Sequence, residues 1–323
     1  MRGIPEILSG GGFVSGEEIS RELGLTRAAV WKRIEALRAA GWDIESGGKR
    51  GYRLRAGDSL APELWQPRLT TRWCGRGEVR FDREVTSTNL VCRELALRGA
   101  PAGSLSLCET QTAGRGRLGR SWISPPESGL WQSVLLRPAL PPQSAPLITL
   151  TVALAMAEAL RETTAIPVRI KWPNDLVCEG KKICGILLES AADPDRLEFV
   201  IAGVGLNVQP GAVPEELRGQ AACVADFCSA PPRRELLCAY LAALERDVDT
   251  LEREGFAGLG SAYRGLSCTL GSAVRVSAAG GESFSGTAEG IDAEGALLVR
   301  CADGSLRRLW AGDVSVRGVM GYV

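Results

Sequence analysis

The chain has 323 residues, which is enough for two or three domains, and its 38 basic residues balance 38 acidic ones. The sequence contains no histidine, which excludes an imidazole base, a Ser-His-Asp triad and a Cys/His zinc site. No apolar run reaches the roughly 18 residues of a membrane span, and the N-terminus lacks a signal-peptide pattern. We therefore expect a cytoplasmic protein without a membrane partner, in which the ten scattered cysteines are small core residues.

The first part of the chain predicts two helices joined by a tight turn. Ser15 and Glu18 have the spacing of a capping box before the first helix. Thr26 can cap the second helix, whose buried face carries apolar residues at helical spacing, namely Val30, Ile34 and Leu37. Gly41 is expected to end this helix.

Two short alternating segments follow and complete the pattern of a winged helix-turn-helix. Trp42/Ile44 and Tyr52/Leu54 flank Gly47-Gly48, as expected of a two-stranded wing. In such domains the second helix lies in the major groove of DNA, and between residues 27 and 55 eight basic residues outnumber three acidic ones. The residues that we expect to contact DNA are Arg27, Lys32, Arg33, Lys49 and Arg50. A helical module for protein contact is the open alternative.

After a Pro-containing connection over 56–67, the pattern becomes α+β. Helices are predicted through Leu90 and Leu95, over 147–160 and over 234–254, the last ended by Gly255. Strands are predicted over 104–109, 130–136, 168–172, 176–178, 183–189 and 197–208. From about residue 270, short β runs with turns at Gly280-Gly281 and Asp303-Gly304 predict a small barrel.

The segment from Gly114 to Trp122 is the strongest functional signal. Its first seven residues contain three glycines and three arginines. Glycine lets a backbone approach an anion closely, and arginine matches phosphate or carboxylate geometry. The run therefore predicts a loop that closes over an anionic ligand, although a flexible linker that contacts nucleic acid has the same composition.

A second segment, from Lys171 to Leu176, favours the ligand loop. Pro173 takes the chain out of its strand, so Asn174 and Asp175 are expected to project from a strand end. Lys182 begins the returning strand. Small residues further along these strands leave room for a flat ligand, namely Gly185, Gly203 and Gly205, with Asn207 beyond them. We expect these segments to form one pocket with residues 114–120 as its lid.

Such a pocket is rich in cations and amides and poor in acids and bases. It suits a reaction in which the substrate supplies the nucleophile and the protein supplies position and charge. Attack of a carboxylate on the α-phosphate of ATP fits, because Arg115, Arg117 and Lys182 would offset the repulsion between two anions. Mg²⁺, held mainly by the phosphates, would share that charge.

These motifs together resemble the bifunctional biotin–protein ligases that also act as biotin operon repressors. The resemblance is carried by the 114–122 run, Ser87-Thr88-Asn89, Gln111, the 171–175 run with Lys182 and Gly185-Ile186-Leu187, and Gly203-x-Gly205-x-Asn207. It implies an α+β multidomain protein with a winged helix-turn-helix over 1–62, a ligase domain with a mixed sheet over 63–269, and an SH3-like β-barrel over 270–323.

The resemblance also implies a two-step reaction. Biotin and ATP give biotinyl-5′-AMP, and the biotinyl group passes to a lysine of the biotin carboxyl carrier protein of acetyl-CoA carboxylase. The adenylate-bound protein would pair as a homodimer on operator DNA and repress biotin synthesis genes.

By motif position, the resemblance assigns roles within the pocket. Biotin is expected to contact Ser87, Thr88, Asn89 and Gln111. Gly114, Arg115, Gly116 and Arg117 would close over the adenylate, with Trp122 near the adenine. The remaining expected ligand-binding residues are Lys171, Asn174, Lys182, Gly185, Gly205 and Asn207. The expected catalytic residues are Lys182, Arg117 and Asp175, with Asp175 as a proton acceptor in the transfer step. Leu118 departs from the family, where a second basic residue is frequent.

Three alternatives remain open on sequence. A lipoate–protein ligase shares the adenylation chemistry, although the Gly-Arg-Gly-Arg loop and the winged helix count against it. A transcription factor could sense the ligand without transferring it, although Lys182 and Arg117 argue otherwise. Finally, the winged helix of a ligase could have lost its DNA contacts.

Overall fold

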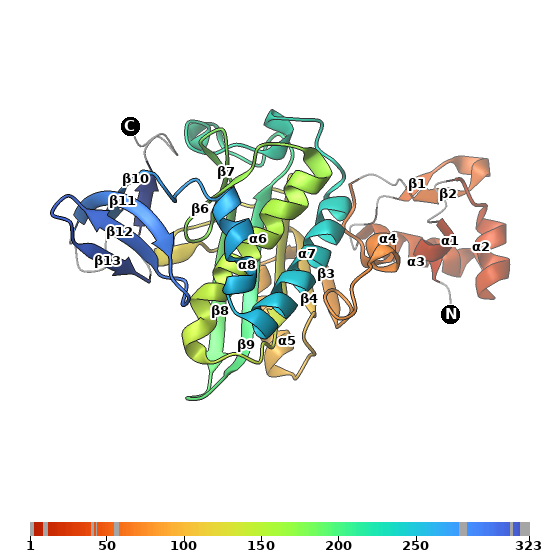
Figure 1. The fold of residues 1–323 in the computed structure, drawn as a ribbon. Coiled ribbons are helices and arrows are strands. Elements are labelled where there is room, and N and C mark those ends of the chain that lie inside the picture. The colour runs from red at the N-terminus through yellow and green to blue at the C-terminus, as the bar shows by residue number, and fades with distance from the viewer. Residues whose placement is uncertain are drawn as a thin grey trace.

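The structure is a computed structural model that describes residues 3–8, 12–39, 42, 44–54, 58–277, 283–310 and 313–316. Figure 1 shows an N-terminal helical domain and a C-terminal β domain at opposite ends of a larger central domain. This order agrees with the architecture expected from the sequence.

The N-terminal domain has the predicted winged helix-turn-helix arrangement. Its elements are α1 (Ile4–Leu8), α2 (Gly16–Leu23), α3 (Arg27–Ala39), β1 (Ile44–Ser46) and β2 (Tyr52–Leu54). The Ser15 Oγ accepts the backbone N–H of Glu18 at 3.1 Å, and the Thr26 Oγ1 accepts that of Ala29 at 3.2 Å, so both predicted caps form. Gly41 lies outside the described residues, and α1 was not predicted.

The described part of the connection to the central domain, from residue 58 onward, is partly buried. It contains α4 (Pro62–Trp65), and Trp65 is fully buried with its Nε1 donating to Leu60 O at 2.9 Å. Leu60 and Trp65 belong to the central core, whereas Ala61 packs into the winged-helix core. The two hydrophobic cores therefore meet along this segment.

A seven-stranded mixed sheet forms the centre of the molecule, in the order β3-β4-β5-β9-β8-β7-β6. Only β3 and β4 run parallel, joined by α5 (Thr88–Leu97), and all other neighbours are antiparallel. The strands are β3 (Val79–Val85), β4 (Leu105–Gln111), β5 (Gly129–Leu136), β6 (Arg169–Lys171), β7 (Asp175–Cys178), β8 (Lys181–Ala192) and β9 (Leu197–Asn207). Strand β3 was missed, because it is half-exposed at an edge and carries four charged residues among seven.

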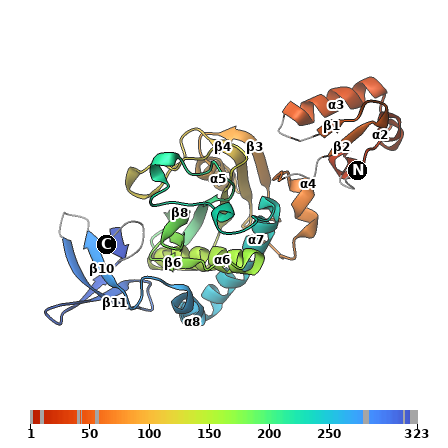
Figure 2. The same ribbon diagram turned by 90° about the horizontal axis from the view of Figure 1, so that it is seen from above.

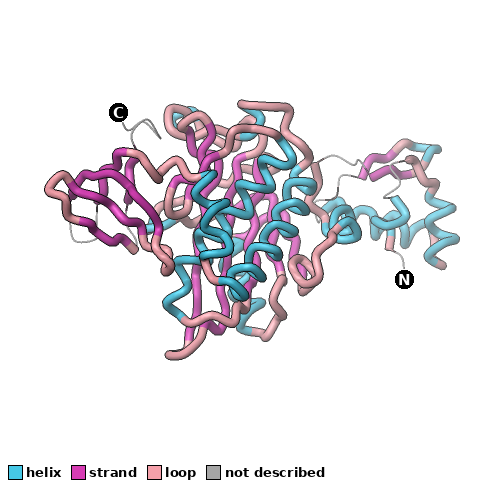
Figure 3. The backbone as a smooth tube through the Cα atoms, viewed as in Figure 1, coloured by secondary structure: helices cyan, strands magenta, loops and turns pink. Residues whose placement is uncertain are grey.

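The two faces of this sheet differ. The helices α6 (Ala145–Thr164), α7 (Arg233–Glu254) and α8 (Ala257–Leu266) pack together over one face, and α5 covers part of the other (Figures 2 and 3). The segment Pro142–Thr164 has the length and hydropathy of a membrane span, but 67% of its apolar window is buried inside the protein. It is therefore the central core helix, as the sequence predicted.

The C-terminal domain is a five-stranded antiparallel sheet in the order β13-β12-β11-β10-β14. Its strands are β10 (Ala273–Ser277), β11 (Ser283–Ile291), β12 (Leu297–Cys301), β13 (Leu306–Leu309) and β14 (Asp313–Val316). The apolar runs predicted β10, β12 and β13. Strand β11 was missed because small and polar residues dominate it, and Gly280-Gly281 lies outside the described residues.

Candidate functional site

A small cavity of about 50 Å³ lies on the face of the sheet that carries α5. It is lined by the start of α5, the end of β4, the Gly/Arg loop, the corner before β7, and β8 and β9. Twelve of the predicted ligand-binding residues line it: Ser87, Thr88, Asn89, Gln111, Arg115, Gly116, Arg117, Trp122, Asn174, Lys182, Gly185 and Gly205. Segments separated by more than one hundred residues thus meet at one place.

One end of the cavity is a hydroxyl–amide cluster. Thr88 donates from its backbone N and its Oγ1 to Gln111 Oε1, at 3.0 and 3.3 Å. Gln111 Nε2 donates to Ser124 Oγ at 2.8 Å. Ser133 Oγ lies 2.8 Å from Thr88 Oγ1 and 2.6 Å from Asn89 Oδ1. The cluster offers donors and acceptors without net charge, which suits an uncharged polar group of a ligand.

Three glycines of β8 and β9 line the cavity, and the side chains of Asn89 and Trp122 pack directly against them. Gly185 pairs with Gly205 across β8 and β9, and Gly203 lies two residues earlier on β9. A Cβ at Gly205 would approach the Trp122 Nε1 to 2.4 Å, and one at Gly203 would approach the Asn89 Oδ1 to 2.1 Å. Such distances are far inside van der Waals contact, so a side chain at either glycine would displace a residue of the site.

Beside Trp122, two lysines converge on one carboxylate. Lys182 Nζ lies 2.6 Å from Asp175 Oδ1, and Lys171 Nζ lies 3.8 Å from Asp175 Oδ2. Lys182 Nζ also lies 5.3 Å from the centroid of the Trp122 ring. Lys182 lines the cavity but Asp175 does not. The Asp175 carboxylate therefore holds the ammonium group of Lys182 in place, and Lys182 lines the cavity that a ligand would occupy.

The Gly/Arg loop is held over the cavity by a few polar contacts. Arg117 Nη1 donates to Asn174 Oδ1 at 2.8 Å, and Asn174 Nδ2 donates to Ile186 O at 3.0 Å. Arg115 Nη2 lies 3.2 Å from Glu189 Oε1, and its side chain is 42% exposed. Leu118 adopts a positive φ of 57° and is exposed. Both arginines are within reach of the cavity without being buried, so they can exchange these partners for an anion.

Three predicted residues stand behind the cavity wall, in addition to Asp175. Lys171 pairs with Asp175 at 3.8 Å and does not line the cavity. Gly114 packs against the backbone of Trp122, whose N donates to Gly114 O at 2.8 Å. Asn207 is buried and donates from Nδ2 to Ala222 O at 3.1 Å. These residues support the site and do not line its cavity.

Several residues of the site were not singled out from the sequence, among them Gln132, Ser124, Ser133 and Glu189. Glu189 binds both Arg115 and Asn89, whose Nδ2 donates to Glu189 Oε2 at 3.1 Å. The sequence contained a signal for Glu189, because alternate residues of a strand share a face and Glu189 is four residues after Gly185 on β8. Ser133 gave no comparable signal, since its role depends on α5 lying against β5.

The cysteines offer no nucleophile to this site. All ten are free thiols. Burial raises the pKa of Cys184, next to Lys182, well above its usual range, and burial raises the pKa of Cys223 to about 11. Among the described residues, no group of three or more Cys, Asp or Glu side chains could hold a metal ion.

The residues predicted to contact DNA are all exposed, namely Arg27, Lys32, Arg33, Lys49 and Arg50. Arg27 Nη2 lies 2.7 Å from Glu17 Oε2, and the Arg50 guanidinium lies 4.1 Å from the centre of the Phe13 ring. Trp31, on α3 between Arg27 and Lys32, is 57% exposed and was not singled out. An exposed tryptophan on this helix is a further candidate for contact with DNA.

Comparisons with known proteins agree with this architecture. Residues 81–207 match the biotin/lipoate A/B protein ligase family, residues 269–317 match the biotin protein ligase C-terminal domain, and residues 4–53 match a helix-turn-helix domain. A solved structure described as biotin protein ligase from Aquifex aeolicus in complex with biotin and ATP superimposes with a TM-score of 0.64 at 28% identity, covering 74% of this chain and 98% of that one.

Relatives of known function span nearly the whole chain. The bifunctional ligase/repressor BirA of Bacillus subtilis is 35% identical over 312 residues, which is 95% of each chain. The protein of the same name from Escherichia coli is 32% identical over 315 residues, covering 96% of this chain and 95% of that one. The chain therefore belongs to the family of bifunctional biotin–protein ligase/repressors.

Proposed function

We propose that this protein is an ATP-dependent ligase that activates biotin as biotinyl-5′-AMP and transfers it to a lysine of the biotin carboxyl carrier protein. The observation that carries the proposal is one cavity lined both by the uncharged cluster around Gln111 and by the cations Arg115, Arg117 and Lys182. The first can bind the ureido ring of biotin, and the second can bind the carboxylate and the phosphates. The biotin- and ATP-bound relative from Aquifex aeolicus supports the choice of ligands.

In the first step, a carboxylate oxygen of biotin attacks the α-phosphorus of ATP. An oxygen–phosphorus bond forms, the bond from the α-phosphorus to the bridging oxygen of the β-phosphate breaks, and pyrophosphate leaves. Lys182 would hold the biotin carboxylate against the α-phosphate, because Lys182 lines the cavity and carries a positive charge. Arg115 and Arg117 would leave Glu189 and Asn174 for the phosphates. Positioning and charge neutralisation supply the catalysis.

Asn174 and Asp175 fit a supporting role toward Mg²⁺. These two residues supply one carboxylate and one amide oxygen, too few to cage the ion and enough to orient one held mainly by phosphate oxygens and water. When bound, the ion would neutralise charge on the phosphates.

In the second step, the acceptor lysine amine attacks the acyl carbon of biotinyl-5′-AMP. A carbon–nitrogen bond forms, the acyl–phosphate bond breaks, AMP leaves, and the amine gives up a proton. We assign Asp175 as the acceptor of that proton. Because Asp175 pairs with Lys182 and stands behind the cavity wall, this role requires Lys182 to shift toward the phosphate.

We further propose that the winged helix binds operator DNA of biotin synthesis genes, and that the adenylate-bound chain acts there as a homodimer in the cytoplasm. The exposed basic residues of α3 and the wing support DNA contact. Two such helices related by a twofold axis would match a palindromic operator.

Mass spectrometry of the protein incubated with ATP, Mg²⁺ and either biotin or lipoic acid tests the ligase. We expect biotinyl-5′-AMP and pyrophosphate in the reaction with biotin, and no adenylate in the reaction with lipoic acid. A lipoyl-adenylate would contradict the substrate, and no adenylate with either acid would leave a ligand-binding repressor without ligase activity.

A further inference from the structure

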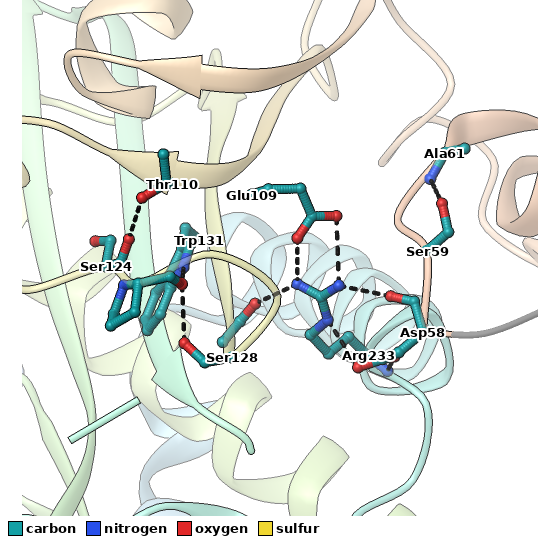
Figure 4. Close-up of polar contacts among 11 residues, drawn as sticks. Asp58, Ser59, Ala61, Glu109, Thr110, Ser124, Ser128, Trp131 and Arg233 are labelled. Carbon is teal, nitrogen blue, oxygen red and sulfur yellow. Dashed lines mark hydrogen bonds and ion pairs between the residues drawn. The ribbon is translucent and has the colours of Figure 1, made fainter. Parts of the chain in front are cut away.

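The first turn of α7 contains an arginine whose side-chain donors are used within the protein (Figure 4). Arg233 is 1% exposed. Its Nε donates to Asp58 Oδ2 at 2.8 Å, and its Nη1 donates to Glu109 Oε2 at 2.8 Å and to Gly129 O at 3.0 Å. Its Nη2 donates to Asp58 O at 2.6 Å and to Glu109 Oε1 at 3.3 Å. The backbone N of Arg233 also donates to Asp58 Oδ1.

The charges of this cluster depend on one another. Burial alone would lower the pKa of Arg233, but Glu109 and Asp58 together raise it, so the guanidinium stays charged. Glu109 is itself 7% exposed and needs this cation, because a buried carboxylate without a partner is strongly unfavourable. Removal of either buried partner, Arg233 or Glu109, would leave a buried charge without its counter-ion.

The cluster joins the interdomain connection to two neighbouring strands of the central sheet. Asp58 follows β2 of the winged helix and precedes the buried Leu60. Glu109 lies in β4 two residues before Gln111, which ends the strand at the cavity. Gly129 begins β5. One side chain therefore ties the connection from the DNA-binding domain to the strand that presents Gln111.

We propose that Arg233 is a positioning residue for the ligand cavity. Its ion pair with Glu109 holds the end of β4 in place. Its ion pair with Asp58 couples the position of the interdomain connection to the position of the same strand. The effect of this link is reciprocal, because two coupled equilibria change each other by the same factor. A ligand bound at Gln111 stabilises the connection at 58–65, and a loosened connection weakens ligand binding. The inference rests on the proposed contact between Gln111 and biotin.

Arg233→Lys and Asp58→Asn in the full-length protein test this link. The lysine keeps the positive charge but loses the planar fork that binds Glu109 and Asp58 together. Isothermal titration with biotin should show a Kd raised about tenfold for Arg233→Lys and about threefold for Asp58→Asn. The kcat at saturating biotin should change by less than about twofold, because neither residue reaches the reacting atoms.

Arg246→Lys is the matched control. Arg246 lies on the same helix and pairs with Glu158 and Asp247, and it does not line the cavity. Its biotin Kd should remain that of the unmodified protein. Equal changes in the control and in Arg233→Lys would overturn the proposal, as would a Kd unchanged by Arg233→Lys or a fall of activity that only follows the folded fraction.

Hydrogen–deuterium exchange tests the reciprocal effect. Biotin with ATP and Mg²⁺ should slow amide exchange at residues 58–65 of the unmodified protein, and Asp58→Asn should abolish that slowing. Amide exchange rates at 58–65 that are the same with and without the ligands would contradict the link.

Gln111→Ala separates this inference from the proposed function. If Gln111→Ala leaves the biotin Kd unchanged, the assignment of the biotin site fails. If Gln111→Ala weakens binding and Arg233→Lys does not, the role of Arg233 fails while the site assignment stands.

Discussion

Two arginine clusters adjoin Gln111 along the chain, through Glu109 before it and Arg115 after it, and they satisfy their charges in opposite ways. Arg233 is 1% exposed and donates to two carboxylates and two carbonyls, one of each from Asp58. Arg115 is 42% exposed on a loop and pairs with Glu189, while Arg117 donates to a neutral amide oxygen of Asn174. An arginine with every partner supplied by the protein holds structure, whereas one with weak partners is free to bind an anion.

Arg233→Ala is expected to have the largest effect on stability. It would leave Glu109 buried without a cation, which costs about 3–5 kcal/mol of unfolding free energy. Urea unfolding measures this change. Arg117→Ala, in contrast, should change the unfolding free energy by less than about 0.5 kcal/mol, as for a partly exposed side chain. Equal losses from the two variants would remove the distinction between the clusters.

Lys182→Ala should have the largest effect on catalysis. Loss of the ammonium group of this cavity-lining residue is expected to lower the rate of adenylate formation about 10²–10³-fold. Pyrophosphate release measures the rate. The circular dichroism spectrum should be unchanged, because Lys171 still pairs with Asp175. Turnover near that of the unmodified protein would exclude Lys182 from the reaction.

Gly205→Ala tests whether the three glycines of β8 and β9 shape the cavity. Its Cβ would meet the Trp122 ring, so we expect the biotin KM to rise about tenfold to a hundredfold. Gly219→Ala is the control, because its Cβ would meet nothing within 4 Å and its φ is not positive. Steady-state kinetics at several biotin concentrations compares the two, and similar KM values would show that Trp122 yields without cost.

Arg117→Ala sharpens the comparison on the catalytic side. Loss of a charged contact to the phosphates should raise the ATP KM or lower kcat by about tenfold. Asn174, its partner, remains bonded to Ile186 O, so the corner should keep its shape. An unchanged kcat/KM for ATP would show that the loop arginine makes no contact during the reaction.

Asp247 gives a smaller, pH-dependent effect. Burial raises its pKa to about 7, against the opposing effect of Arg246. The pKa of Asp247 is therefore higher in the folded state than in the unfolded state. The protonated carboxyl group stabilises the folded protein at low pH, and this stabilisation is lost as the pH rises through 7. Asp247→Asn should therefore gain stability relative to the unmodified protein between pH 5 and pH 8, by about 2 kcal/mol. Thermal unfolding at both pH values measures it, and a constant difference would contradict the raised pKa.

The sequence predicted the parts of the fold that have strong periodicity. The helices α3 and α7 and the buried strands β5 and β9 were identified, because their apolar residues repeat with a clear period. The strands β3 and β11 were missed, since their exposed, polar residues resemble those of loops. The Pro-containing connection at 56–67 gave no sequence signal for the burial of Trp65, because that burial depends on packing against elements far along the chain.

What the sequence alone determined was the identity of most groups that gather around the cavity, because glycines, arginines and lysines at motif spacing have specific chemistry. Tertiary structure decided which of them line the cavity and which support it. Asp175, Asn207 and Gly114 stand behind the wall, and Glu189 and Ser133 join the site because β8, β5 and α5 meet there. Tertiary structure also created the Arg233 cluster, since Asp58, Glu109 and Arg233 are separated by up to 175 residues and are brought together only by the fold.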